Sequence, residues 1–228
     1  MKRRAFVVEL TGARGVGKST VAAALKLELR ERGIDCDPRV RRRLLNRLRD
    51  RVRGAFLTGT ALLSFTGWRP ASVTELSKLL RRYRSLCMAM GRADEHGGVH
   101  VIDEGLCHLA LTTYIKTANK DMISLFGELG RRVRLPDVVV LVVGSEEVVA
   151  QRRSQRSNAG DRRTPRVSLE GQLALRALED ALEATQAGEP DLTYLRIDNE
   201  FQDGRRAAKL IADTIARQLA ARPNSEVD

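Results

Sequence analysis

Apolar residues occur along this chain in two patterns, short continuous runs and helical spacing, which together are typical of an α/β protein. Continuous runs at 5–10, 99–102 and 138–143 predict buried strands of a parallel sheet. The segments 34–36 and 192–197 predict two further strands. We therefore expect an α/β fold built on a mainly parallel, five-stranded sheet.

Helices are predicted where apolar residues recur three or four positions apart between these runs. A capping-box sequence at Ser72–Glu75 opens one helix, and Gly33 is placed to end the first. The predicted helices are 18–32, 39–53, one opened by 72–75, 106–118, 120–134, one beginning near 145, 169–187 and 205–221. Because α/β folds of this size commonly form one unit, we expect a single domain over residues 1–228.

The first predicted strand leads directly into Gly12–Ser19, which fits the phosphate-binding pattern G-x-x-x-x-G-K-[ST]. Its glycines allow positive φ angles, so that successive N–H groups point at an anion, and the next helix adds its positive dipole end. Lys18 can bind terminal phosphates, and the Ser19 hydroxyl can bind the Mg²⁺ that bridges them. The predicted nucleotide-binding residues are Gly12, Ala13, Arg14, Gly15, Val16, Gly17, Lys18, Ser19 and Thr20.

Acidic residues follow two predicted strands, at the edge where open α/β sheets bind ligands. Asp103 and Glu104 come after strand 99–102, and Asp37 comes after 34–36. Such an acid can hold a Mg²⁺-bound water or accept the proton of a nucleophile that attacks the terminal phosphate. We assign Asp103 to the metal together with Ser19, and either Asp37 or Glu104 to the base. The alternative for the Asp103-Glu104 pair is to cap the next helix.

Basic residues are in excess, with 40 Lys and Arg against 29 Asp and Glu and a net charge of +11. This balance indicates acidic partners such as nucleotide phosphates or nucleic acid. Arginines cover one face of the predicted helix Arg39–Arg53, which is either a solvated surface or the binding face for such a partner. The basic segment 152–168 either closes over bound phosphates, where Arg152 and Arg156 would stabilise the transferred group, or is a disordered loop.

Aromatic residues are few, and Phe65 lies in the irregular section 54–70 with Trp68 close by. These rings are candidates to stack on a base, and core packing is the other use for them. The three cysteines lack C-x-x-C spacing, so no disulfide framework or zinc site is indicated. No apolar run approaches the roughly 18 residues that a membrane span needs, and we expect a cytoplasmic protein.

With these residues in place, the chain resembles the P-loop nucleoside and nucleotide kinases, most nearly the thymidylate kinase group. The matching places are 12–20, Asp37-Pro38, 101–105 with Arg82 or Arg84 before it, and 147–152 followed by Arg153 and Arg156. The resemblance implies a three-layer α/β/α P-loop fold, the cofactors ATP and Mg²⁺, and phosphoryl transfer to a small nucleoside- or nucleotide-like acceptor. It also implies that 39–98 forms the substrate side and that 152–168 forms a lid in which Arg152 contacts ATP. The polar residues 222–228 predict a tail.

One departure from this family concerns the acceptor. The family commonly has Asp-Arg where this chain has Asp103-Glu104. Because a carboxylate there repels an acceptor phosphate, the change favours a hydroxyl acceptor. The predicted acceptor-side residues are Asp37, Phe65, Arg82, Arg84 and Glu104.

Two other functional hypotheses stay open, and so does a homodimer. One is a nucleic-acid-directed P-loop enzyme, either a polynucleotide kinase or a nucleic-acid-stimulated ATPase, that binds nucleic acid through the Arg39–Arg53 face. The other is a nucleotide-binding switch without catalysis.

Overall fold

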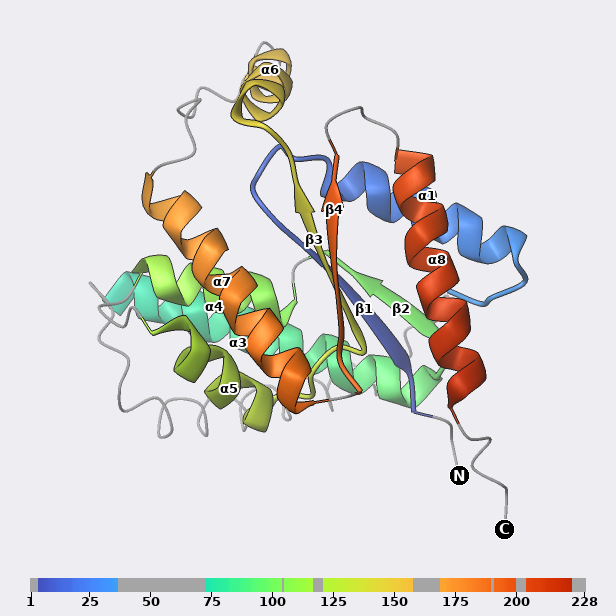
Figure 1. The fold of residues 1–228 in the computed structure, drawn as a ribbon. Helices are drawn as coiled ribbons and strands as arrows, with labels where there is room; N and C mark the ends of the chain where they lie inside the picture. Colours follow the sequence, from blue (N-terminus) through green and yellow to red (C-terminus); the bar gives the residue numbers. More distant parts are fainter. Residues whose placement is uncertain are drawn as a thin grey trace, which may run out of the picture.

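A parallel sheet lies between two layers of helices (Figure 1). The computed structural model describes residues 4–36, 73–103, 105–116, 121–157, 169–189, 191–199 and 204–222. Its strands are β1 (Phe6–Thr11), β2 (Val99–Ile102), β3 (Val138–Val143) and β4 (Thr193–Asp198). They are arranged in the order β2-β1-β3-β4, and every neighbouring pair is parallel.

The helices divide between the two faces of the sheet. Helices α1 (Lys18–Glu31) and α8 (Gly204–Ala221) pack on one face. The other face is covered by α3 (Val73–His96), α4 (Leu106–Lys116), α5 (Met122–Arg132) and α7 (Leu169–Gly188). Helix α6 (Glu146–Ser157) follows β3 and stands beyond its carboxyl end (Figure 1). The predicted three-layer α/β fold is therefore confirmed.

Two apolar cores hold these layers together, one on each face of the sheet. Alternate residues of β1 enter different cores, because successive side chains of a strand point to opposite faces. Val7 packs with α3, α4, α5 and α7, whereas Val8 packs with α1 and α8. Strand β3 is buried along almost its whole length, as a strand covered on both faces should be.

The predicted number of strands needs a correction. Within the described residues the sheet has four strands, and the predicted strand 34–36 contributes one isolated parallel bridge between Cys36 and Val99. The predicted position next to β2 is right, but the described part of the segment makes a single bridge and no ladder. Gly33, with φ of 72°, ends the first helix as predicted, because this left-handed conformation strains other residues.

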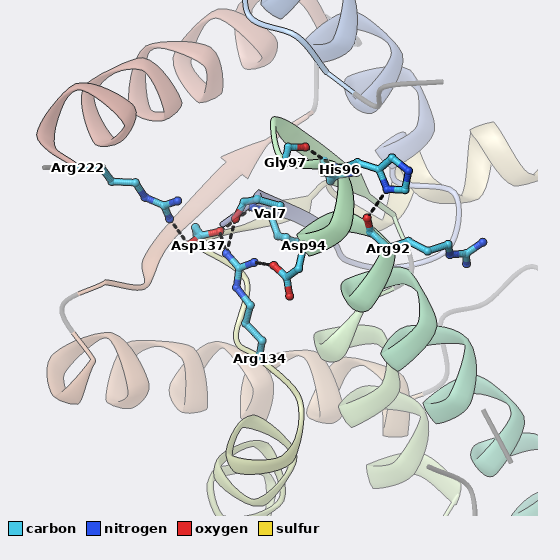
Figure 2. A network of polar contacts seen from close by, with 10 residues as sticks. Val7, Arg92, Asp94, His96, Gly97, Arg134, Asp137 and Arg222 are labelled. Atoms are coloured by element: carbon cyan, nitrogen blue, oxygen red, sulfur yellow. Dashed lines mark hydrogen bonds and ion pairs between the residues drawn. The ribbon is translucent and has the colours of Figure 1, made fainter. Parts of the chain in front are cut away.

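A buried acid joins several segments at the amino end of the sheet, away from the predicted site (Figure 2). Asp137 accepts hydrogen bonds from the Val7 amide at 2.6 Å and from the Arg134 guanidinium at 2.7 Å. Arg222, which follows α8, also pairs with Asp137 and lies 4.6 Å above the ring of Phe6. One carboxylate thus ties β1, the approach to β3 and the end of α8 together.

Among the described residues, no helix combines the length and apolarity needed to cross a membrane. Cys36, Cys87 and Cys107 are buried free thiols.

Candidate phosphate-binding site

The connection from β1 to α1 bends back sharply over the sheet at three glycines. Gly12, Gly15 and Gly17 have φ angles of 138°, 90° and 100°. A Cβ atom at Gly12 would lie 2.1 Å from the backbone oxygen of Val142 in β3. The loop therefore runs so close to the neighbouring strand that a side chain at this position cannot fit, which explains the first glycine of the motif.

Among the described residues, no side chain caps the amino end of α1. Its N-cap is Gly17, which has no side chain that could accept a hydrogen bond from the first-turn amides. By contrast, the first turn of α5 is capped by Asp121, which accepts from the Ser124 amide at 3.0 Å. Uncapped first-turn amides carry the positive end of the helix dipole, so this end of α1 suits an anion supplied from outside the helix.

Lys18 lies against the inside of the loop. Its ammonium donates to the backbone oxygens of Gly12 at 2.8 Å and Ala13 at 3.0 Å. The next two residues, Ser19 and Thr20, are exposed at the start of α1. Lys18, the two exposed hydroxyl residues and the glycine turns therefore lie together in one loop.

Two side chains from distant parts of the sequence fix the middle of the loop. Arg152 in α6 donates to the backbone oxygen of Val16 at 2.7 Å and to that of Asn199 at 3.0 Å. The Asn199 side-chain amide also donates to Val16, at 2.8 Å. A Cβ atom at Gly17 would lie 2.5 Å from this amide nitrogen and 3.2 Å from a guanidinium nitrogen of Arg152. Arg152 therefore contacts the backbone of the phosphate loop, and its predicted contact with ATP stays a prediction.

Asn199 was not among the predicted site residues. Its position directly after the last strand, at the carboxyl edge of the sheet, was the available signal.

Of the acids predicted at the carboxyl edge of the sheet, one lies within the described residues. Asp103 follows β2 directly and is exposed. Because β2 is the parallel neighbour of β1, Asp103 and the phosphate loop lie at the same edge of the sheet. Asp37 and Glu104, the two candidates for the base, lie outside the described residues, as do Phe65 and the Arg39–Arg53 face.

The predicted acceptor-side arginines lie on α3. Arg82 donates to the Thr112 hydroxyl of α4 at 2.5 Å, and Arg84 is half-buried. The first residues of the predicted lid, 152–157, belong to helix α6. The described part of the chain does not include residues 158–168 or the side chains of Arg153 and Arg156.

A second missed residue is Glu9, an acid in the middle of the buried strand β1. Its carboxylate accepts hydrogen bonds from the first amides of α4: Leu106 at 2.7 Å, Cys107 at 2.7 Å and His108 at 3.3 Å. Burial raises the pKa of the Glu9 carboxyl from 4.5 to about 7, and the three amide hydrogen bonds oppose part of this increase. An acid inside an otherwise apolar strand was the sequence signal for an internal partner.

The raised pKa predicts that Glu9 makes the protein less stable as the pH rises. A carboxyl whose pKa is higher in the folded state binds its proton more tightly there, so its contribution is fully present below pH 4.5 and is lost as the pH rises through about 7. Between pH 5 and pH 8 we expect the free energy of unfolding to fall by about 2–3 kcal/mol through this group. Burial and the adjacent Glu9 raise the pKa of the Cys107 thiol, so that thiol stays protonated in this range.

The measurement is urea unfolding at several pH values for the wild type and Glu9→Gln. The difference between the two proteins isolates Glu9 from the other titrating groups. A difference that does not change between pH 5 and pH 8, or that grows in favour of the wild type as the pH rises, contradicts the prediction.

Solved structures with the same arrangement identify the fold. A thymidylate kinase from Candida albicans superposes with a TM-score of 0.52 and 16% identity, over 94% of this chain and 94% of that one. A deoxyadenosine kinase from M. mycoides, solved with bound dCTP, superposes with a TM-score of 0.50 and 12% identity, over 93% of this chain and 100% of that one. This chain has a P-loop kinase fold.

The likeness to the thymidylate kinase group is thus confirmed at the level of the fold. No protein-family model matches this chain, and no curated protein matches its sequence. At these identities the likeness extends to the arrangement of strands and helices, and the chemistry has to be argued from the residues of the site.

Proposed function

We propose that this protein is an ATP-dependent kinase that transfers a phosphoryl group from Mg-ATP to a small nucleoside- or nucleotide-like acceptor. The observation that carries the proposal is the loop from Gly12 to Thr20. Its three glycines have positive φ, its lysine lies inside the turn, and it opens a helix with no side-chain cap. Two kinases with the same fold support the proposal.

The loop would hold the phosphates of ATP by its backbone amides and by Lys18. Such catalysis consists mainly of positioning and of stabilising charge, since the transferred group needs little covalent help from the protein. Arg152 and Asn199 would keep the loop in its binding conformation through the Val16 carbonyl. Asp37 or Glu104 would take the proton of an acceptor hydroxyl, and Arg152 and Arg156 would stabilise charge on the transferred group.

Ser19 and Asp103 suit Mg²⁺ by the chemistry of their donor atoms. A hydroxyl and a carboxylate are hard oxygen ligands, and Mg²⁺ commonly takes one or two protein ligands and completes its shell with phosphate oxygens and water. The described residues contain no cluster of three His, Cys, Asp or Glu that could hold a metal by itself. When bound, the ion would neutralise charge on the phosphates.

The acceptor side would be formed by the five predicted residues. Arg82 and Arg84 on α3 are the described residues assigned to it, and Asp37, Phe65 and Glu104 complete the predicted set. The Asp103-Glu104 pair favours a hydroxyl acceptor over a phosphate. Cytoplasmic location, a homodimer and nucleic-acid binding through Arg39–Arg53 stay predictions.

The test supplies Mg-ATP with separate nucleosides, nucleoside monophosphates, sugars and oligonucleotides, and measures which compound accelerates ADP release. We expect a nucleoside or nucleotide to give the largest acceleration, with the phosphorylated acceptor identified by mass spectrometry. Acceleration by oligonucleotides alone would favour the nucleic-acid-directed enzyme instead. Tight ATP binding with no acceleration by any compound would favour a switch.

A further inference from the structure

We propose that Glu9 is a positioning residue that holds Asp103 in place beside the phosphate loop, by fixing both ends of the connection between β2 and α4. This inference rests on the proposed function, since it concerns the acid assigned to the metal. It goes beyond that function by giving a role to a residue that contacts neither nucleotide nor acceptor in the assignment above.

The first end of the connection is fixed by strand pairing. Glu9 is the register partner of Ile102, the last residue of β2, and Asp103 follows immediately. The second end is fixed by the Glu9 side chain, which binds the amides of Leu106, Cys107 and His108. The backbone and side chain of a single residue therefore hold the chain on either side of Asp103.

Close packing at Gly105 shows that the connection is fitted to this carboxylate. A Cβ atom at Gly105 would lie 2.4 Å from a Glu9 carboxylate oxygen and from the carboxyl carbon. No side chain can enter this contact without moving Glu9. The glycine thus lets the first turn of α4 approach β1 closely enough for three amides to share one carboxylate.

Strand β1 also connects Glu9 to the phosphate loop. Three residues after Glu9, β1 becomes the loop at Gly12, so the same strand carries the phosphate-binding turn and the anchor of the acidic connection. Groups that orient a metal ligand without binding the metal themselves commonly cost about 10–100-fold in metal affinity or activity when they are removed.

The test compares Glu9→Gln with a matched control, Asp121→Asn. Both variants change a carboxylate to an amide at a helix amino end, but Asp121 caps α5, which lies away from the site. For each protein, calorimetry measures ATP binding with and without Mg²⁺, and thermal unfolding measures stability. The kcat and KM values on the best acceptor are measured as well.

In Glu9→Gln we expect the Mg²⁺ concentration for half-maximal enhancement of ATP binding to rise about 10-fold and kcat to fall about 10-fold. Binding of ATP without Mg²⁺ should stay within about 2-fold, because the loop itself is intact. Asp121→Asn should lower only the unfolding midpoint. A Glu9→Gln protein that loses stability but keeps its Mg²⁺ dependence and kcat shows a purely structural Glu9 and overturns the proposal.

Two further outcomes separate this proposal from the proposed function. If no acceptor is phosphorylated by the wild type, the kinase assignment fails, and Mg²⁺-dependent ATP binding still decides the role of Glu9. If wild-type ATP binding does not respond to Mg²⁺, the positioning role is overturned. Should Glu9→Gln fail to fold, Gly105→Ala displaces the carboxylate without removing it, and the same shift in Mg²⁺ dependence is expected.

Discussion

Replacing Lys18 by alanine is expected to lower kcat at least about 10²-fold, the loss typical when one electrostatic stabiliser of a transition state is removed. The ammonium of Lys18 lies inside the loop, against the oxygens of Gly12 and Ala13, where it can meet the terminal phosphates. Its charge would be most valuable as negative charge redistributes over the transferred group. The expected result is a larger effect on kcat than on KM for ATP, measured by steady-state kinetics with the best acceptor.

The matched control is Lys209→Ala, an exposed lysine on α8. This variant removes the same charge from the molecule without touching the loop, so its kcat should equal that of the wild type. Circular dichroism and thermal unfolding should show that Lys18→Ala is folded. A folded Lys18→Ala protein whose kcat stays within about 2-fold of the wild type would reject the assignment of the loop as the catalytic phosphate site.

Replacing Asp137 by alanine is expected to lower the free energy of unfolding by about 3–5 kcal/mol, the cost of breaking a buried ion pair by removing one partner. The change removes the buried carboxylate partner of the Arg134 guanidinium, whose side chain is 12% exposed, and leaves, among the described residues, only the exposed carboxylate of Asp94 as its ion-pair partner. It also removes the acceptor of the Val7 amide and the partner of Arg222. Urea unfolding gives the magnitude.

Two variants give this prediction its controls. Asp137→Asn keeps the volume and one acceptor oxygen, so it should be destabilised less and should still fold if Asp137→Ala does not. Asp213→Ala removes an exposed carboxylate that pairs with Arg32 on the surface and should change the midpoint much less. Because Asp137 lies at the opposite end of the sheet from the phosphate loop, kcat of the folded variants should be unchanged. Similar destabilisation by Asp137→Ala and Asp213→Ala would contradict the prediction.

The sequence predicted most of the local structure correctly. Strands β1, β2, β3 and β4 and helices α1, α4, α5, α7 and α8 lie within a few residues of their predicted positions. These elements have continuous or periodic apolar runs, and their ends are marked by residues such as Gly33 whose effect is local. The sheet was predicted with five strands, whereas the described residues form four and the segment 34–36 makes one isolated bridge. The apolar pattern of a short segment does not say how many of its residues find a partner.

The candidate site also has a part that the sequence predicted and a part that it did not. The loop from Gly12 to Thr20 was found because its chemistry is encoded in adjacent residues. Asn199 and Arg152 meet at the Val16 carbonyl although they lie 183 and 136 residues away in the sequence. No local pattern marks such a meeting point.

The sequence by itself therefore determined the glycine turn after β1, the alternation of strands and helices, and the acid that follows β2 at the carboxyl edge of the sheet. Only the tertiary structure decided what the buried acids do: Glu9 binds the start of α4, and Asp137 joins β1 to two arginines. The physical reason is that turns and periodic faces depend on near neighbours, whereas a buried carboxylate depends on partners that only the packed chain brings within hydrogen-bond distance.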